Sequence, residues 1–587
     1  MNYNAKNFKV FQASAGSGKT YTIIKEYLKL CLKSENQVKN FQNILAITFT
    51  NASANDMKAK IIKDLKAIIS SSEVKENTME ADLINELGIS DAELKHNAQL
   101  LLTQIIHDYS SFCVSTIDAF VQKISRSFAR DLGLPSQYSV SIDEDEVVDT
   151  VVANLGMQIN DDNKFLVAIL KNFINNQFDK EEKFDLSSKL AGFAKKLLSE
   201  KAYNRYETNT IDSENSYQQA DKFLKAKMDS FPKSVDDFIK TFDAFVSRHG
   251  LQTEDFYYGS KGLPSFVNNL KNKDFKAPNS YVQKVINGEE WYSAKAKKRF
   301  GKEELNAIGD ELLTFLPQFA QDYKKGLAEY LFYNSQRELL YLYALRTQIR
   351  GEMEKLAEDE DIVHISEFNK LISSVLGDFS VPFIYERIGE KYKHIFIDEF
   401  QDTSILQWQN LIPMIDNGLA SGNMSMIVGD GKQSIYRFRS GEVEQIVKLP
   451  EIHALPQDER KDAFEHYEET LTSNFSFKNL ECNYRSFSEI VNFNNDFFAQ
   501  TIKFLKPDSQ KVYADKDEKH QKEVRIEQEA KKSGQGLVEI DLFSKDSEKD
   551  YYLSRIKEII DELTQKRGYE HSDICILTRK TDTGSII

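Results

Sequence analysis

One short string restricts the folds open to this chain more than any other feature. Residues 13–20 read ASAGSGKT, and the first of them is also the last residue of the apolar, strand-like segment FKVFQA at residues 8–13. Apolar residues then recur at helical spacing, at Ile24, Leu28 and Cys31. A glycine-rich loop between a strand and a helix is typical of proteins that bind a phosphate group in an α/β fold.

The letters of this loop indicate how it would hold a nucleotide. Gly16 and Gly18 let the backbone wrap closely, so that successive amide groups and the start of the next helix can face a phosphate. Lys19 would contact the terminal phosphates as a point charge, and Thr20 would offer its hydroxyl to Mg²⁺. We therefore expect this loop to bind ATP and magnesium.

Strands and helices continue to alternate after the loop. NILAITFT (residues 43–50) and FCVSTI (residues 112–117) read as strands, and each precedes a segment with helical periodicity. Such repetition predicts a parallel sheet with helices packed on both faces. The apolar positions of the two helices are Met57, Ile61, Leu65 and Ile68, then Phe120, Ile124 and Phe128.

Changes in pattern divide the rest of the chain. Long, charged, Phe-rich helical segments run to about residue 330, and strand–helix alternation then returns at HIFIDEF and MSMIVGD. A polar stretch precedes a new strand–helix–strand unit, from LVEIDLF to DICILTR. We expect an α/β domain in two parts (1–134 and 331–505), a helical insertion (135–330), a linker (506–536) and the start of a second α/β domain (537–587).

An acidic pair follows the strand HIFI. In a parallel sheet this strand end opens onto the same crevice as the phosphate loop. Asp398 is suited to hold magnesium, directly or through water, and Glu399 is suited to orient and deprotonate an attacking water. The pair therefore predicts nucleotide hydrolysis.

Composition excludes some classes of protein. The net charge of −15 argues against a protein that holds nucleic acid by bulk positive charge, although a local groove needs few basic groups. No apolar run approaches bilayer length and the N-terminal residues lack an apolar signal core, so a cytoplasmic location is the default. The four cysteines, which are far apart and give no sign of a structural metal, are Cys31, Cys113, Cys482 and Cys575.

Six strings occur in the order found in superfamily-one DNA helicases. Their wording most resembles the RecB and AddA branch of the UvrD-like helicases, which act in DNA repair and recombination. The resemblance implies a RecA-like motor domain interrupted by a helical accessory insertion, followed by the beginning of a second RecA-like domain. The strings are ASAGSGKT, ILAITFTNASANDMKAKI, VSTIDAF, FIDEFQDTS, VGDGKQSIYRFRSGE and LECNYRS.

The resemblance also assigns roles to single residues. Gln433 resembles the glutamine that senses the γ-phosphate, and Arg485 resembles an arginine that contacts it. Tyr484 resembles the aromatic residue on which adenine stacks. Phe49 and Phe438 look like the aromatics against which single-stranded bases stack, although ordinary core packing is an alternative for both. The expected sites are thus ATP-binding Ala13, Ser14, Ala15, Gly16, Ser17, Gly18, Lys19, Thr20 and Tyr484; metal-binding Thr20 and Asp398; catalytic Glu399, Gln433 and Arg485; and DNA-binding Phe49 and Phe438.

Base stacking suits a motor that passes over any sequence. It contributes on the order of 1–3 kcal/mol per base and is tolerant of sequence, so an acidic protein can hold DNA with modest electrostatics. Two positions depart from the family pattern. Asp118 stands where relatives often have histidine, and no separate glutamine motif precedes the phosphate loop, which leaves Gln12 as a candidate contact to adenine.

The resemblance predicts an ATP-dependent DNA helicase or translocase that moves 3′ to 5′, with a possible partner subunit in a helicase–nuclease complex. The family's second motor domain supplies an arginine worth roughly 10³–10⁵ in rate, and no string here resembles it. We therefore expect an N-terminal fragment that binds ATP and DNA but hydrolyses ATP slowly. The alternative is an ATP-gated DNA-binding or scaffold subunit without motor activity. A third possibility is another lineage of ATPases, such as the transporter type. Those proteins carry an LSGGQ-like string shortly before the acidic strand, and the residues before HIFIDEF contain nothing like it.

Overall fold

Two compact units make up the chain in the computed structural model. One comprises Met1–Phe11 and Ile23–Lys478, and the other comprises Gln12–Thr22 and Asn479–Ile587. The structure describes residues 6–130, 132, 134, 138–141, 144–160, 163–178, 185–200, 214–359, 362–377, 388, 390–456, 460–510, 527–534, 536–542 and 549–587.

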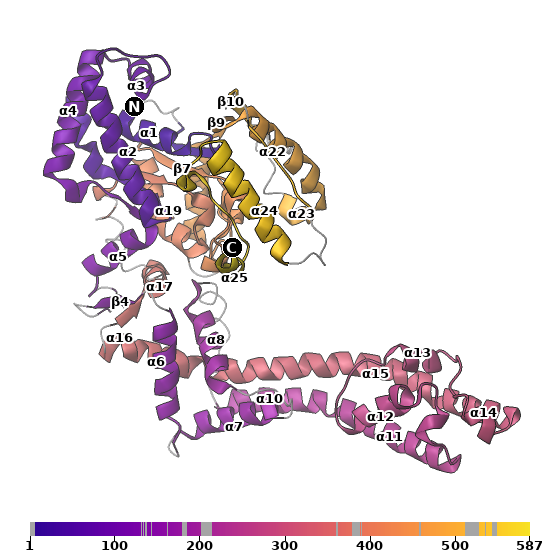
Figure 1. Cartoon of the computed structure of the whole chain (residues 1–587). Coiled ribbons are helices and arrows are strands. Elements are labelled where there is room, and N and C mark those ends of the chain that lie inside the picture. The colour runs from indigo at the N-terminus through magenta and orange to yellow at the C-terminus, as the bar shows by residue number, and fades with distance from the viewer. Residues whose placement is uncertain are drawn as a thin grey trace. The chain divides into compact units, whose positions relative to one another are not determined.

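A six-stranded sheet organises the first unit, in the order β3-β2-β6-β7-β1-β8 (Figure 1). The strand β2 pairs in parallel with β3 and β6, and β6 pairs in parallel with β7. Every residue of β2 and of β7 is buried, as expected for strands covered by helices on both faces. The predicted α/β class is confirmed. The strands are β1 (Phe8–Ala13), β2 (Ile44–Thr48), β3 (Val114–Thr116), β6 (His394–Ile397), β7 (Ser425–Gly429) and β8 (Phe475–Leu480).

The helices outside the insertion bury the apolar positions that periodicity marked, except Ile124, which is partly buried. On α1 these are Ile24, Leu28 and Cys31, all at most 1% exposed. The four predicted positions of α2 are likewise buried, and Phe120 of α5 is 2% exposed. The helices outside the insertion, from α1 to α21, are α1 (Lys19–Leu32), α2 (Asn51–Ser70), α3 (Met79–Leu87), α4 (Asp91–His107), α5 (Ile117–Ser127), α17 (Ile365–Gly377), α19 (Ile405–Ala420), α20 (Glu444–Lys448) and α21 (Lys461–Ser473).

A helical insertion lies between β4 (Ser139–Ser141) and β5 (Ile362–His364), which pair with each other in parallel. Its longest helix, α15, runs from Lys302 to Ala344 and continues through the predicted boundary at residue 330. In Figure 1, α10 lies along α15, and α11 to α13 gather at the other end of that helix. The insertion helices are α6 (Glu144–Met157), α7 (Lys164–Phe178), α8 (Leu186–Leu198), α10 (Glu214–Met228), α11 (Ser230–Arg248), α12 (Leu263–Lys271), α13 (Ser280–Ile286), α14 (Ala296–Arg299), α15 and α16 (Arg346–Asp359).

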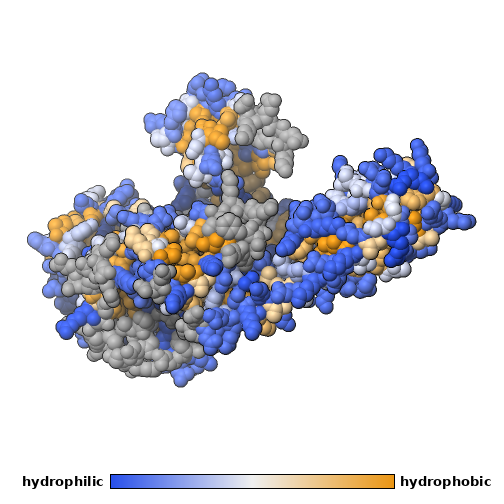
Figure 2. Space-filling view, turned by 90° about the horizontal axis from the view of Figure 1, so that it is seen from below, coloured by the Kyte–Doolittle hydropathy of each residue, from blue (hydrophilic) through white to orange (hydrophobic). Residues whose placement is uncertain are grey.

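The two ends of α15 belong to different hydrophobic cores. Leu312 and Leu316 pack with α11 to α13, whereas Leu340 and Tyr341 pack with α6 to α8. Hydrophilic residues cover most of the insertion in the view of Figure 2, with hydrophobic ones visible between them. Of the helices that the structure describes, none is both long and apolar enough to cross a lipid bilayer.

The second unit differs from its prediction in two places. The strand β10 (Glu529–Lys532) lies inside the predicted linker and pairs in parallel with β9 (Cys482–Phe487). The described parts of LVEIDLF and DICILTR contain no strand, and Leu542 and Leu577 are 92% and 91% exposed. Alternating apolar residues therefore predicted these two strands wrongly, because a strand also requires a neighbour with which to form hydrogen bonds. The helices of this unit are α22 (Ser488–Thr501), α23 (Pro507–Gln510), α24 (Lys549–Asp561) and α25 (Thr581–Ile586).

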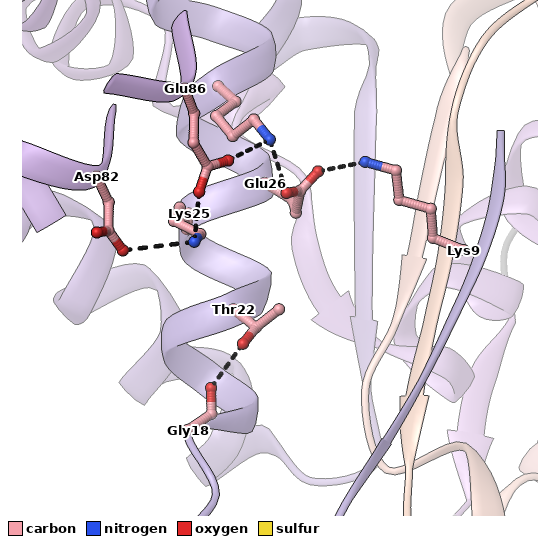
Figure 3. Close-up of polar contacts among 8 residues, drawn as sticks. Lys9, Gly18, Thr22, Lys25, Glu26, Asp82 and Glu86 are labelled. Atoms are coloured by element: carbon pink, nitrogen blue, oxygen red, sulfur yellow. Dashed lines mark hydrogen bonds and ion pairs between the residues drawn. The ribbon is translucent and has the colours of Figure 1, made fainter. Parts of the chain in front are cut away.

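A network of charged side chains fixes α1 against β1 and α3 (Figure 3). At its centre, Glu26 is 6% exposed and accepts hydrogen bonds from Lys9 (2.7 Å) and Lys29 (2.9 Å). Burial opposes ionisation of Glu26, but the two lysines outweigh it and hold the pKa of this carboxyl below its ordinary value. The full network comprises Lys9, Lys25, Glu26, Lys29, Asp82 and Glu86.

Replacing Glu26 by glutamine is expected to destabilise α1 by about 1–3 kcal/mol, because two partly buried lysines lose a charged acceptor that is itself buried. A lowered folded pKa stabilises the fold above the unfolded pKa, and this contribution disappears as pH falls through the folded pKa. The difference from wild type should therefore be complete at pH 7 and shrink below about pH 4. Hydrogen exchange of peptides from α1 measures it. The matched control is Asp56→Asn, whose partly exposed ion pair with Lys60 should matter by less than about 1 kcal/mol.

Candidate active site

The phosphate loop turns at its two glycines. Gly16 has φ +77° and Gly18 has φ +88°, values that other residues adopt only with strain. Between them, Ser17 donates to the carbonyl oxygen of Ser14 from its amide (3.2 Å) and from its hydroxyl (2.7 Å). At the start of α1, the Thr22 hydroxyl donates to the Gly18 carbonyl oxygen at 3.1 Å. The backbone thus turns tightly at the two glycines, as their letters indicated, and hydrogen bonds within the loop hold this form.

The segment NYRS lies against this loop, although more than 460 residues separate the two in sequence. The side-chain amide of Asn483 donates to the Ala15 carbonyl oxygen (3.1 Å), and the Tyr484 amide donates to the Gly16 carbonyl oxygen (2.9 Å). A Cβ atom at position 16 would lie 2.7 Å from Asn483 Oδ1 and 2.9 Å from Arg485 Cβ. Gly16 is therefore required for this close approach as well as for its positive φ. The structure brings Gly16, Tyr484 and Arg485 together, and their roles at a nucleotide stay predictions.

Asn483 holds the NYRS segment in its turn, and the sequence had not indicated a role for it. It is 6% exposed, and its Oδ1 accepts hydrogen bonds from the amides of Arg485 (2.9 Å) and Ser486 (2.9 Å). This side chain therefore shapes the turn that carries Arg485 while its nitrogen binds the phosphate loop. The Tyr484 ring is 56% exposed.

The acidic pair sits at the end of β6. The amide of Asp398 donates to the Ile47 carbonyl oxygen (2.8 Å), which extends the pairing with β2, and Asp398 Oδ1 accepts from the Glu399 amide (3.0 Å). Glu399 has φ +52°, in the left-handed region. Such a backbone costs about 1–2 kcal/mol for a residue with a side chain and is common at functional sites.

Glu399 and Gln433 belong to one chain of hydrogen bonds. Gln401 donates to Glu399 Oε2 (2.6 Å) and accepts from the Asp430 amide (2.9 Å), so it joins the ends of β6 and β7. Asp430 in turn accepts from the Gln433 side chain (2.8 Å) and pairs with Lys432 (3.0 Å). Gln401 and Asp430 are each 1% exposed. Both lie within the strings that identified their neighbours, but the sequence did not indicate that they would connect those neighbours.

An aromatic face forms beside this cluster. The rings of Phe49 and Tyr436 lie 4.5 Å apart, and those of Tyr436 and Phe438 lie 5.9 Å apart. The Arg439 guanidinium lies 5.8 Å from each of the rings of Tyr436 and Phe438. Phe438 is 78% exposed and Phe49 is half-buried. The two predicted DNA-stacking residues are thus joined through Tyr436, to which the sequence assigned no role.

Asp118, the departure from the family pattern, lies at the start of α5. Its Oδ1 accepts a hydrogen bond from the Gln407 side chain at 3.0 Å, which ties α5 to α19. Burial raises the pKa of the Asp118 carboxyl, against the opposing effects of Gln407 and Arg439. In this position Asp118 has a structural role, because it links two helices.

The sequence profile of the UvrD/REP helicase N-terminal domain matches residues 3–454, about three quarters of the chain. The chain belongs to the UvrD/REP helicase family. The predicted RecA-like α/β fold and the RecB/AddA branch agree with this match and with the relatives below.

Its relatives include bacterial proteins that are named as a subunit of an ATP-dependent helicase/nuclease. That of Lactobacillus acidophilus is 23% identical over 97% of this chain and 46% of its own length, and that of Lactobacillus helveticus is 24% identical over the same shares. The Listeria monocytogenes protein is 25% identical over 73% of this chain and 34% of its own length. This UvrD-family chain thus spans about half the length, or less, of these relatives.

Proposed function

We propose that this chain is the nucleotide-binding part of an ATP-driven DNA helicase or translocase that moves 3′ to 5′ and acts in DNA repair and recombination. One observation carries the proposal. The segment from Asp430 to Arg439 holds Gln433 in the hydrogen-bonded cluster with Glu399 and, a few residues later, Tyr436 and Phe438 in the aromatic face. A change sensed at the nucleotide can therefore reach the bases through one short stretch of backbone.

The residues of the phosphate loop and the acidic cluster have the chemistry that Mg·ATP requires. Lys19 would neutralise the terminal phosphates, and the loop amides would bind their oxygens. Magnesium commonly takes one or two protein carboxylates with phosphate oxygens and water, and Asp398 and the Thr20 hydroxyl fit that set of ligands. Held by these two residues, the ion would offset the negative charge that develops on the phosphates. Convergence of the loop and the acidic cluster on one triphosphate remains a prediction.

Glu399 is proposed to orient the attacking water and accept its proton. The hydrogen bond from Gln401 holds the Glu399 carboxylate in a fixed orientation. Gln401 is also connected through Asp430 to Gln433, the residue proposed to sense the γ-phosphate, so a change at Gln433 can alter the orientation of the carboxylate. Arg485 is proposed to bind the γ-phosphate, and Tyr484 to stack on adenine.

A protein that only clamps DNA in response to ATP is the competing function. A clamp needs the phosphate loop and the aromatic face, but it does not need the buried link between Glu399 and Gln433. The word "subunit" in the names of the relatives supports a partner protein in a helicase–nuclease complex for either function. Stopped-flow translocation along single strands of increasing length, in a polypeptide that includes the second motor domain, separates the two. Release times that do not grow with length would favour the clamp.

Replacing Lys19 by alanine is expected to weaken Mg·ATP binding at least about tenfold, because a charge-assisted contact to phosphate contributes about 1.5 kcal/mol or more. Titration of a fluorescent ATP analogue into the 587-residue chain measures this change. Lys33→Ala, close in sequence but outside the loop, is the control. If Lys19→Ala bound the ATP analogue with unchanged affinity, the result would contradict the proposed nucleotide site.

A further inference from the structure

We infer that Gln528 is a positioning residue of the nucleotide site, which holds the phosphate loop in its binding conformation through the Ala15 carbonyl group. This inference rests on the proposed ATP binding. Gln528 lies in the stretch predicted to be a linker, just before β10, and outside the six strings that resemble the helicase family. Nothing in its local sequence marks it as part of the site.

The contacts of Gln528 show how it reaches the loop. Its side-chain nitrogen donates to the Ala15 carbonyl oxygen at 3.2 Å, and its side-chain oxygen accepts from Asn483 at 3.0 Å. Asn483 donates to the same Ala15 oxygen. Two amide side chains, one from β9 and one from the residue before β10, therefore hold a single carbonyl group of the phosphate loop.

The backbone of Gln528 is itself fixed. Its amide donates to Asn495 Oδ1 (3.0 Å), and its carbonyl oxygen accepts from Asn495 Nδ2 (3.0 Å). The next residue, Glu529, pairs with Cys482 in the parallel register of β10 and β9. The Gln528 side chain thus extends from a support that is held on both sides.

Holding the Ala15 carbonyl determines the direction of an anion-binding amide. A trans peptide is planar, and its C=O and N–H bonds point in opposite directions. Because the Ala15 oxygen is directed at Asn483 and Gln528, the Gly16 N–H is directed to the opposite side of the loop. The Gly16 carbonyl is held in the same way by the Tyr484 amide. Loop amides that are already oriented before the phosphate arrives bind it without the cost of ordering the backbone.

Replacement of Gln528 separates positioning from simple space-filling. In Gln528→Ala, both hydrogen bonds of the side chain are lost, and we expect the Kd for Mg·ATP to rise about 3- to 10-fold. In Gln528→Glu, the side chain keeps its size and its acceptor for Asn483 but presents a carboxylate to the Ala15 oxygen and adds negative charge. We therefore expect Gln528→Glu to bind more weakly than Gln528→Ala. A residue that only fills space would give the reverse order.

The measurement uses the 587-residue chain, with titrations of a fluorescent ATP analogue and competition by inorganic tripolyphosphate. Both ligands should weaken by the same factor, because the contact serves the loop and not the base. Gln510→Ala is the matched control, since Gln510 also donates to a backbone carbonyl, that of Leu505, in the same unit. Its affinity and melting temperature should equal those of wild type.

Three results would overturn the inference. These are wild-type affinity in Gln528→Ala, wild-type affinity in Gln528→Glu with a loss in Gln528→Ala, and a loss for ATP without a loss for tripolyphosphate. Failure of the unsubstituted chain to bind Mg·ATP would instead contradict the proposed function, and the inference with it. The titration of the unsubstituted chain therefore distinguishes the two failures.

Discussion

Replacing Glu399 by glutamine is expected to slow DNA-stimulated ATP hydrolysis by about 10²- to 10⁴-fold while leaving the Kd for Mg·ATP within about twofold of wild type. Glutamine keeps the shape of the side chain and can still accept the hydrogen bond from Gln401, but it cannot take a proton from water. Single-turnover hydrolysis and nucleotide titration measure the two quantities separately, in a polypeptide that also carries the proposed second motor domain.

The backbone makes this substitution informative. Glu399 already occupies the left-handed region, so a change of residue type could relax the turn as well as remove the carboxylate. Glutamine has the same backbone preferences, and hydrogen exchange of the β6–α19 segment should match wild type. Glu451→Gln, an exposed carboxylate of the same unit, should leave both rate and affinity unchanged. Hydrolysis by Glu399→Gln at more than about a tenth of the wild-type rate would assign the water-activating role to another residue.

Local sequence patterns predicted those parts of the site in which one segment supplies both the chemistry and the geometry. The positive φ angles of Gly16 and Gly18 and the buried face of α1 follow from their own letters. The role of Gln401 and Asp430 could not be predicted from their local sequence. Their importance comes from a hydrogen bond between the ends of two strands, and neither segment alone indicates which polar group of the other it will meet.

The same distinction explains the errors in the fold. Residues 529–532 look like part of a polar linker, yet they form a strand because β9 offers backbone partners in register. LVEIDLF has the alternation of a strand, yet its described residues are in no strand. Pairing between distant segments decides both outcomes, and an alternating pattern reports only on the faces of one segment. The boundary predicted at residue 330 fell inside α15 because the two ends of this helix pack into different cores.

Removing the exposed ring of the aromatic face, with Phe438→Ala, is expected to weaken binding of single-stranded DNA by roughly 5- to 150-fold, since each stacked base contributes about 1–3 kcal/mol. Phe438 is the most exposed ring of the face, so a base can reach it without displacing a neighbouring side chain. Fluorescence anisotropy with a labelled oligo-dT and the 587-residue chain measures the Kd. Phe438→Tyr should retain most of the affinity, whereas Phe438→Leu, which keeps apolar bulk without a ring, should not.

Salt dependence distinguishes stacking from phosphate contact at this face. Loss of a stacked base should raise the Kd by a similar factor at every salt concentration, because no counterion is released when a base meets a ring. Arg439→Ala should instead reduce the slope of log K against log salt, by about 0.7 if Arg439 neutralises one phosphate of a single strand. An unchanged Kd for Phe438→Ala would contradict the stacking role and return Phe438 to ordinary surface packing. A loss for Phe438→Ala that disappears at high salt would show that the ring acts only by holding Arg439 in place over Tyr436.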